Sequence, residues 1–586
     1  MSDAPDDAQP PEGLAADSPS SRGLAAEQQR LVRIGGDKGL SLAEKLADRV
    51  RHLGYRTPLH RLRLRGRYPL RLLGVPVDPV AGDADAGATI VQGRMSHVGY
   101  NAAAASLAFN DPAAPAAWRD WANGFAWLRD LAAAAARERG ARVAEPLVVR
   151  WLAQNGDFDA ASWRPDLVGS RLLFWAAYAP YILSSGDLVY RSAVLNGMAR
   201  AARHLDRAAA RLPGDLSAVT AFAGLVAAGL LIQGGEGRLK RGEAGLARAL
   251  DAVLLADGGV VTRAPRDGLE LLELLLLVAA VYRIADTAPP PLLDAAIVRL
   301  IAALKGVARG NGAIGAWHGG GGIAAERLAR AVAAAGGEVV AGALHGAQSG
   351  YQRLAAGRTI LIVDAGPPPV ARVAPAAHAG TLAFEMSDGV VPLIVNCGGA
   401  RGLPRPLPPA LAAGLRSTAA HSTLVLDDIN STRIRPDGAL GRGVEEVVAS
   451  RQATEEGSWL DLSHDGYARR HGVCHRRRLF VSADGTDVRG EDSLEAVSRR
   501  RAPKGRIDVR FHLGPGVEAT PTADEHGALL RLPDGRVWQF RARGGSLAVE
   551  ASLWLNFDGK PRATQQLVVN AAASETISWT FKRIGK

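Results

Sequence analysis

The sequence predicts a segregated α+β fold in which an α-helical domain precedes an antiparallel β-sandwich. Between about residue 41 and residue 345, apolar side chains recur every three or four positions, as one face of a helix requires. From about residue 346 to residue 586 the period is two, and Asp-Gly pairs at Asp388, Asp484 and Asp534 are typical of tight hairpin turns. Helices that all precede the strands favour two separate domains over a sheet with interleaved helices.

Residues 1–40 are expected to form a disordered acidic tail. This segment is rich in Asp, Pro, Ser and Ala, and it offers few apolar side chains to bury. It also lacks the apolar core of a signal peptide, which predicts a cytoplasmic protein.

The helical domain, residues 41–345, is expected to consist of antiparallel helix pairs. In "LLDAAIVRLIAALKGVARGNG" (residues 292–312), Leu293, Ile297, Leu300 and Leu304 fall on one face, with prolines before the helix and a glycine after it. The most apolar run, "LLELLLLVAAVY" (residues 271–282), is interrupted by Glu273 and is shorter than the roughly 20 residues of a membrane span. We therefore expect a buried helix there and no membrane span.

The net charge of +11 indicates the kind of partner that this surface attracts. The acidic residues of the tail mask part of the basicity, so the remainder of the chain is more basic still. Such a field favours nucleic acid, anionic lipid or acidic polysaccharide. The alternative is an arginine-rich composition without functional meaning. No recognition helix or aromatic-basic strand module is evident, so we predict no nucleic-acid partner; the sequence indicates no oligomeric state.

Aromatic and basic residues gather in "WLAQNGDFDAASWRPDLVGSRLLFWAAYAPYIL" (residues 151–183). Tryptophan faces stack on sugar rings, and arginine pairs with carboxylate or sulfate groups. Trp163 and Arg171 are therefore predicted to bind substrate. The alternative is an ordinary aromatic core between helices.

Several motifs of the second half occur together in a known order. They are "SGYQRLAAGRTILIVDAG" (residues 349–366), "HAGTLAFEMSDG" (378–389), "AHSTLVLDD" (420–428) and "FHLGPGVEA" (511–519). With the helical first half, they resemble the heparinase II/III-like family of polysaccharide lyases. The resemblance implies an incomplete (α/α) toroid followed by a β-sandwich. It also implies β-elimination of a uronic-acid polysaccharide, and a cell-envelope or periplasmic location as the alternative to cytoplasm.

The resemblance further implies a structural zinc ion. The family motif places two zinc-binding histidines on His378 and His421, and its zinc-binding aspartate on Asn396. Because an amide is a poorer ligand than a carboxylate, the neighbouring Cys397 is a second possible ligand. We expect nitrogen atoms of the two histidines to lie roughly 3 to 4 Å apart, as a shared zinc or a direct hydrogen bond requires.

The family's catalytic groups do not align with matching residues here. The catalytic histidine falls on Ala376, the Asn-His pair near Ser217, and the tyrosine at about Asp267. Tyr351, His464 and Tyr467 are the predicted catalytic substitutes, and each has the alternative of packing between strands.

The sequence therefore leaves two main hypotheses. The first is a lyase that cleaves an acidic polysaccharide with a divergent acid/base set. The second is a catalytically weakened glycan-binding or polysaccharide-assembly protein. For both, we expect a cleft between the toroid and the sandwich, lined by Trp163, Arg171 and Tyr351.

Overall fold

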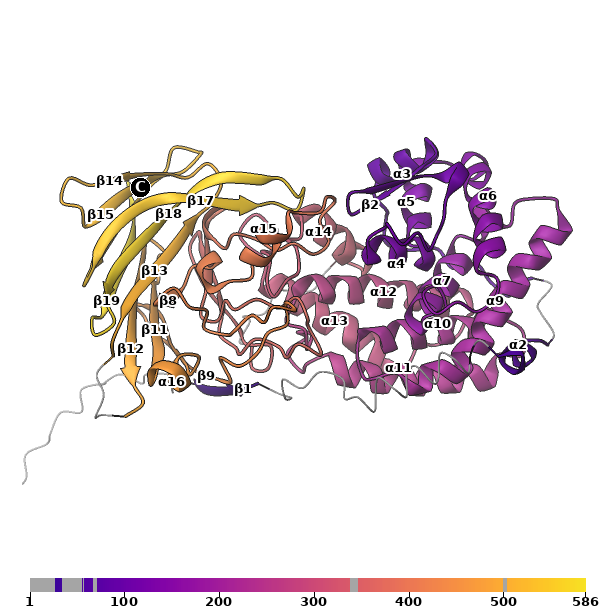
Figure 1. Ribbon diagram of the computed structural model, residues 1–586, viewed down its shortest axis with the longest axis horizontal. Coiled ribbons are helices and arrows are strands. Elements are labelled where there is room, and N and C mark those ends of the chain that lie inside the picture. Colours follow the sequence, from indigo (N-terminus) through magenta and orange to yellow (C-terminus); the bar gives the residue numbers. More distant parts are fainter. Residues whose placement is uncertain are drawn as a thin grey trace, which may run out of the picture.

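A helical half and a sandwich half lie end to end in the molecule (Figure 1). The computed structural model describes residues 27–33, 55, 57–66, 71–337, 346–498 and 503–585. Within these residues the helices precede the long strands, so the predicted α+β class with an α-helical toroid and an antiparallel sandwich is confirmed.

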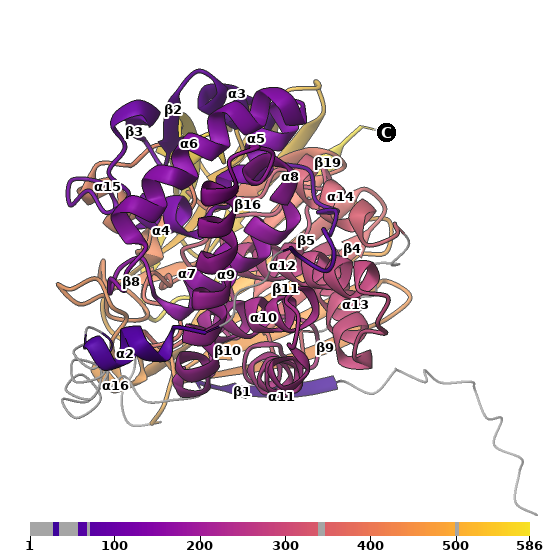
Figure 2. The same cartoon turned by 90° about the vertical axis from the view of Figure 1, so that its right-hand side faces the viewer.

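The helical half contains thirteen described α-helices and one short hairpin. The helices are α2 (Pro58–Arg63), α3 (Ala84–Val91), α4 (Ala116–Gly124), α5 (Trp127–Ala134), α6 (Arg137–Asn155), α7 (Pro165–Ala177), α8 (Ala179–Ile182), α9 (Leu188–Ala208), α10 (Leu216–Leu231), α11 (Glu236–Val253), α12 (Pro265–Ile284), α13 (Pro291–Gly306) and α14 (Ala325–Ala334). The hairpin pairs β2 (Arg94–His97) with β3 (Tyr100–Ala103). Figure 2 views this half from its free end.

Close helix packing builds the core of the helical half. Helix α13 buries Leu293, Ile297, Leu300 and Leu304, the face that the sequence pattern predicts. Helix α12 contains the most apolar run and is buried on nearly all sides. Among the described residues, no helix is long and apolar enough to cross a membrane.

Two glycines let helices α7 and α10 approach closely. A side chain at Gly169 would collide with the backbone of α10, and one at Gly224 would collide with the backbone of Gly169. The helix axes can therefore approach more closely than larger residues would allow, which brings both helices to the same side of the toroid.

The second half is a sandwich of two antiparallel sheets. The nine-stranded sheet has the order β1-β9-β10-β11-β12-β19-β16-β15-β14, and the other has the order β17-β18-β13-β7-β6-β5-β4 with β8 beside β13. The strands are β1 (Glu27–Val32), β4 (Tyr351–Ala356), β5 (Thr359–Asp364), β6 (Phe384–Asp388), β7 (Val391–Val395), β8 (Leu424–Leu426), β9 (Glu446–Ala453), β10 (Gly457–His464), β11 (Val473–Ser482), β12 (Asp487–Ala496), β13 (Arg506–Leu513), β14 (Glu518–Pro521), β15 (Gly527–Arg531), β16 (Val537–Arg543), β17 (Ser546–Leu555), β18 (Pro561–Ala572) and β19 (Ile577–Ile584). Short helices α15 (Pro409–Gly414) and α16 (Ala468–His471) interrupt them.

The inward faces of the two sheets form one apolar core. Phe384 of β6 stacks on Trp579 of β19, with ring centroids 5.6 Å apart, and Phe511 of β13 meets the same indole edge-on. The Asp388-Gly389 turn joins β6 to β7, with Gly389 in the left-handed region at φ 57°, as the sequence predicts.

The N-terminal segment departs from the prediction of a disordered tail. Residues 27–32 form strand β1, which pairs antiparallel with β9 at the edge of the nine-stranded sheet (Figure 1). Arg30 pairs with Glu446, and the Gln29 side chain donates to the Gly346 carbonyl at 2.9 Å. Prediction of disorder is therefore wrong for this stretch, because backbone pairing to an open sheet edge needs little apolar burial. Residues 1–26 and 34–40 of the predicted tail lie outside the described residues.

Candidate functional site

A large cleft lies where the helical half meets a loop of the sandwich half. Its volume is about 680 Å³. Helices α4, α5, α7, α10, α12 and α14 contribute most of the lining, and Arg401 and Gly402 come from the sandwich half. Both halves thus contribute to the cleft, as the sequence analysis predicts.

Charged side chains on the cleft wall neutralise one another. The lining carboxylates are Asp83, Asp130, Asp166, Asp267, Glu270 and Glu273, and the arginines are Arg129, Arg266, Arg327, Arg330 and Arg401. Glu273 accepts two hydrogen bonds from Arg327, both at 2.9 Å, and lies 3.7 Å from Arg129. Burial opposes the charge on Glu273, but these arginines outweigh it and lower its pKa. The wall therefore carries almost no net charge to attract a polyanion.

Arg401, in the loop after β7, connects the sandwich half to the helical half. It forms ion pairs with Asp267 and, at 3.4 Å, with Glu270, both on α12. Its backbone carbonyl accepts a hydrogen bond from the Gly321 N–H at 2.9 Å. Burial opposes the charge on Arg401, yet the carboxylate of Asp267 outweighs it and raises the pKa. Asp267 is therefore held in an ion pair with a residue of the sandwich half.

An aromatic platform forms one side of the cleft. The His97 and Trp121 rings stack with centroids 4.8 Å apart and planes 11° apart. Burial, assisted by the charge of Arg266, lowers the pKa of His97 to about 4, so its imidazole is neutral at physiological pH. Neutral stacked rings of this kind offer a face to a sugar.

Two of the family's aligned catalytic positions lie in this cleft. Ser217 and Asp267 both line it, whereas Ala376 lies against Gly319 in the loop after α13. Among the described lining residues there is no tyrosine, and His97 is the only histidine. Burial raises the pKa of the Asp130 carboxyl, which also lines the cleft, to about 6.

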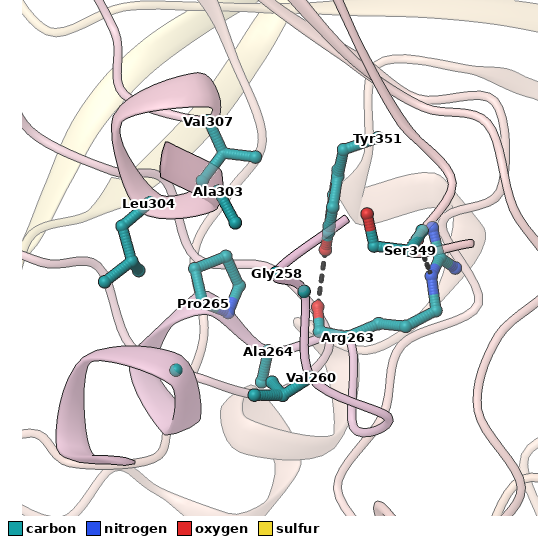
Figure 3. Close-up of a pocket in the computed structure, with 12 residues that line it drawn as sticks. Gly258, Val260, Arg263, Ala264, Pro265, Ala303, Leu304, Val307, Ser349 and Tyr351 are labelled. Atoms are coloured by element: carbon teal, nitrogen blue, oxygen red, sulfur yellow. Dashed lines mark hydrogen bonds between the residues drawn. The ribbon is translucent and has the colours of Figure 1, made fainter. Parts of the chain in front are cut away.

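Tyr351 does not reach the cleft. Its ring is buried, and its hydroxyl donates to the Arg263 carbonyl at 2.5 Å (Figure 3). The Arg263 guanidinium lies over the ring, 5.1 Å from its centroid, and pairs with Asp364. Burial raises the pKa of Tyr351 well above its usual value. The prediction that it acts on substrate is therefore corrected: Tyr351 ties β4 to the start of α12 beside a cavity of about 30 Å³.

His464 and Tyr467 are buried inside the sandwich. The Tyr467 hydroxyl donates to the Leu424 carbonyl at 3.1 Å. The Gly466 N–H donates to His464 Nδ1 at 3.0 Å, and His464 Nε2 lies 3.3 Å from His475 Nδ1. Both nitrogens of His464 are thus engaged within the core. These two residues lie 5.6 Å apart between ring centroids, but they pack strands together, and their predicted catalytic role is corrected.

Trp163 and Arg171 are also buried, which corrects the prediction that they bind substrate. Arg171 Nη1 donates to the carbonyls of Asn123 (3.0 Å) and Ser162 (3.1 Å), and its guanidinium lies 4.1 Å from the Trp151 ring centroid. Trp163 Nε1 donates to a backbone carbonyl of α6. Backbone carbonyls and the face of an indole ring thus stabilise the buried Arg171 cation. Both residues belong to an aromatic core between helices, which is the alternative that the sequence left open.

His378 and His421 meet as the sequence predicts. His378 Nδ1 and His421 Nε2 lie 3.1 Å apart. His421 Nδ1 lies 2.7 Å from the Ser417 carbonyl, which can only accept, so His421 Nε2 is the acceptor and His378 Nδ1 the donor. Burial lowers the pKa of His421 to about 4 and that of His378 well below its usual value. Two neutral imidazoles therefore share one hydrogen bond.

The surrounding residues do not fit a tetrahedral zinc ion. Asn396 Oδ1 already accepts from the Ser422 N–H at 2.9 Å, and Cys397 Sγ faces His512 at 3.4 Å. Burial raises the pKa of the Cys397 thiol to about 12, so it stays protonated. In the described part of the chain, no three His, Cys, Asp or Glu residues are grouped as a metal site needs. The residues supply two imidazole ligands and no anionic one.

The cleft depends on residues that the sequence analysis did not single out. Trp118 and Trp121 are three residues apart on α4, a spacing that puts two indoles on one helix face, yet only Trp121 lines the cleft. His97 and Arg401 stand in no motif. Their role depends on contacts between distant segments.

Comparisons with known proteins agree with this architecture. Residues 339–581 match the family model "Heparinase II/III-like, C-terminal". The chain is 31% identical over 572 residues to FtsZ-localized protein C of Caulobacter vibrioides, covering 92% of this chain and 94% of that protein. Among solved structures, heparinase III superposes with a TM-score of 0.68 at 11% identity, covering 92% of this chain and 89% of that one. Heparan sulfate lyase HepC from Pedobacter heparinus gives 0.58 at 14% identity, covering 93% and 88%.

The structural neighbours share the order of a helical half and a sandwich half over nearly the whole chain, and the family model covers most of the sandwich half. At these identities the solved structures establish the fold alone. The chain therefore belongs to the heparinase II/III-like family.

Proposed function

We propose that this protein is a non-catalytic member of the heparinase II/III-like family that binds a saccharide segment of low net charge in its cleft. The observation that carries the proposal is the state of the aligned catalytic positions. Ser217 and Asp267 line the cleft without a tyrosine or a titrating histidine, and Arg401 neutralises Asp267. β-Elimination needs a base, a proton donor and a group that neutralises the substrate carboxylate, and such a set is not assembled there.

The charge balance of the wall favours a weakly charged ligand over a polyanion. Internal ion pairs already use most of the arginines that would hold sulfate or uronate groups. Stacking on the His97–Trp121 platform is the remaining source of affinity for a sugar ring. Since the chain is similar to a protein described as FtsZ-localized, we further propose that it acts together with FtsZ.

Incubation with a panel of uronic polysaccharides tests the loss of catalysis. We expect no rise in the near-ultraviolet absorbance of an unsaturated uronyl end. A saccharide array then identifies ligands. Trp121→Ala should weaken binding about fivefold, the effect of roughly 1 kcal/mol of lost stacking. Trp459→Ala is the matched control, because that indole is exposed on β10 of the sandwich. Equal weakening by both variants would place the ligand elsewhere.

Co-sedimentation with FtsZ polymers tests the second part separately. We expect the full chain to pellet with the polymers, and Trp121→Ala to pellet equally well. Failure of the parent protein to pellet would contradict the link to FtsZ without bearing on saccharide binding.

An active lyase is the second candidate function, and one observation favours it. The carboxyl of Asp130, with its pKa raised to about 6 by burial and by the nearby Asp83, is suited to act as a general base. If the polysaccharide panel yields unsaturated products, Asp130→Asn should abolish them, and the non-catalytic proposal fails.

A further inference from the structure

A second pocket opens on the sandwich half, between helix α15 and strand β17. Its volume is about 430 Å³, and it shares no lining residue with the cleft. Cys397, Ser417 and Ser552 contribute a thiol and two hydroxyl groups to the lining, and the other lining residues are alanine, leucine and glycine. The lining residues are Cys397, Ala410, Leu411, Gly414, Leu415, Ser417, Ala419, Ala420, Ala551, Ser552 and Leu553.

Ser552, which lines this pocket, forms a hydrogen-bonded pair with His512 behind it. His512 lies on β13 and is buried, whereas Ser552 lies on edge strand β17 and is partly exposed. Ser552 Oγ lies 2.8 Å from His512 Nδ1. His512 Nε2 lies 3.0 Å from the Ala419 carbonyl, which can only accept a hydrogen bond. The proton of the imidazole is therefore on Nε2, and Nδ1 is free to accept the serine proton.

Cys397 supports this arrangement without competing as a nucleophile. Its sulfur lies 3.4 Å from His512 Nδ1 and 4.0 Å from Ser552 Oγ. Burial holds its thiol protonated, and thiolate is the reactive form of cysteine. The backbone N–H of Leu553 donates to the same sulfur, which helps to fix the thiol beside His512. A serine, a base within hydrogen-bond distance and a group that orients the base meet the geometric requirements of an activated nucleophile.

We infer that Ser552 and His512 form an acyl-transfer site that accepts a small uncharged ester with an apolar acyl group in the α15–β17 pocket. Ser552 Oγ attacks the ester carbonyl carbon while His512 Nδ1 takes the hydroxyl proton. The bond from carbon to the leaving oxygen breaks, and His512 returns the proton to that oxygen. The products are an acyl-Ser552 ester and the free alcohol. Water then attacks the acyl group with the same proton relay, releasing a carboxylic acid and Ser552.

Release of the acyl group should be slower than its transfer to Ser552. A neutral carbonyl orients His512, where hydrolytic triads use a carboxylate that stabilises the imidazolium. An ester with a good leaving alcohol should therefore acylate the protein in a burst and turn over slowly.

Incubation of the full chain with p-nitrophenyl butyrate tests the inference. We expect a burst of about one p-nitrophenolate per chain and a butyryl group on the peptide that contains Ser552. Ser552→Ala should reduce the burst rate at least about a hundredfold, as loss of an activated nucleophile does. Ser546→Ala, at the exposed start of the same strand, is the matched control and should leave the burst unchanged.

Further measurements test whether the variants are folded and whether the pocket prefers uncharged esters. Thermal unfolding should confirm that every variant is folded. A p-nitrophenyl ester with a terminal carboxylate should react more slowly, because the pocket lining offers no cation. Absence of a burst in the folded parent protein, persistence in Ser552→Ala, or a butyryl group on another residue would overturn the inference. None of these results depends on saccharide binding in the cleft.

Discussion

The hydrogen-bond network around Asp492 gives a quantitative test of how the sandwich is held together. Asp492 is fully buried on β12. Its Oδ1 accepts from Arg477 Nε at 2.7 Å and from His475 Nε2 at 2.8 Å. Its Oδ2 accepts from Arg477 Nη2 at 3.0 Å and from Trp579 Nε1 at 2.9 Å. Each carboxylate oxygen thus receives two donors.

Replacement of Asp492 by asparagine should destabilise the sandwich by about 3 to 5 kcal/mol. Whichever oxygen the amide nitrogen replaces, two donors then face another donor, at about 1 to 3 kcal/mol for each group left unsatisfied. The charge of Arg477 also loses its counter-ion. That guanidinium donates to the Leu382 and Ser422 carbonyls, both at 2.8 Å, so the loss spreads to the loops of the second sheet.

Asp461→Asn is the matched control. Asp461 pairs with Arg476 on the outer side of β10, where the two side chains are 37% and 31% exposed. Exposed pairs contribute about 0 to 1 kcal/mol. Urea unfolding followed by far-ultraviolet circular dichroism, with hydrogen exchange of the β11 and β12 amides, measures the difference. If both variants lose the same stability, the network does not act as described.

Three further predictions follow from single contacts. The pKa of Asp130 is about 6 in the folded chain and its reference value is 3.8, so the free energy of unfolding should fall as pH rises from about 4 to about 6. Asp130→Asn should remove this pH dependence from the unfolding midpoints. An unchanged pH dependence would contradict the effect of burial. Elemental analysis should find background zinc in the parent and equally in His378→Ala and His421→Ala; one zinc per chain, lost in both variants, would restore the metal site. Gly169→Val should lower stability by about 1 to 3 kcal/mol by forcing α7 from α10, whereas Gly186→Val, with open space around it, should not.

The fold could be predicted from the sequence because each element carries its own pattern. The apolar face of α13 and the Asp388-Gly389 turn depend on neighbouring residues only. Strand β1 could not be predicted in this way. Its partner β9 is more than 400 residues away (416 between Arg30 and Glu446), and an edge strand needs no continuous apolar face.

The candidate site was harder to predict because it depends on whether a polar side chain is buried. Trp163 and Arg171 have the composition of a sugar-binding surface, but backbone carbonyls and other indoles satisfy them inside the helical half. The histidine pair was predicted correctly, since the family motif fixes both positions. Whether the pair could bind zinc depended on a third ligand at Asn396. The sequence did not show that the side-chain oxygen of Asn396 accepts a hydrogen bond from the Ser422 N–H.

The Asp267–Arg401 ion pair occupies the position that the family alignment assigns to a tyrosine. By the family alignment Asp267 stands where a tyrosine exchanges a proton with substrate, a role that requires a group free to meet a ligand. Here it is buried and paired with Arg401, whose backbone also accepts from Gly321 of the loop after α13. The contact joins the first turn of α12, that loop and the loop after β7. The ion pair fixes the Asp267 side chain between the two halves and stabilises their relative position. Under the non-catalytic proposal, the contact therefore contributes a rigid wall to the binding cleft.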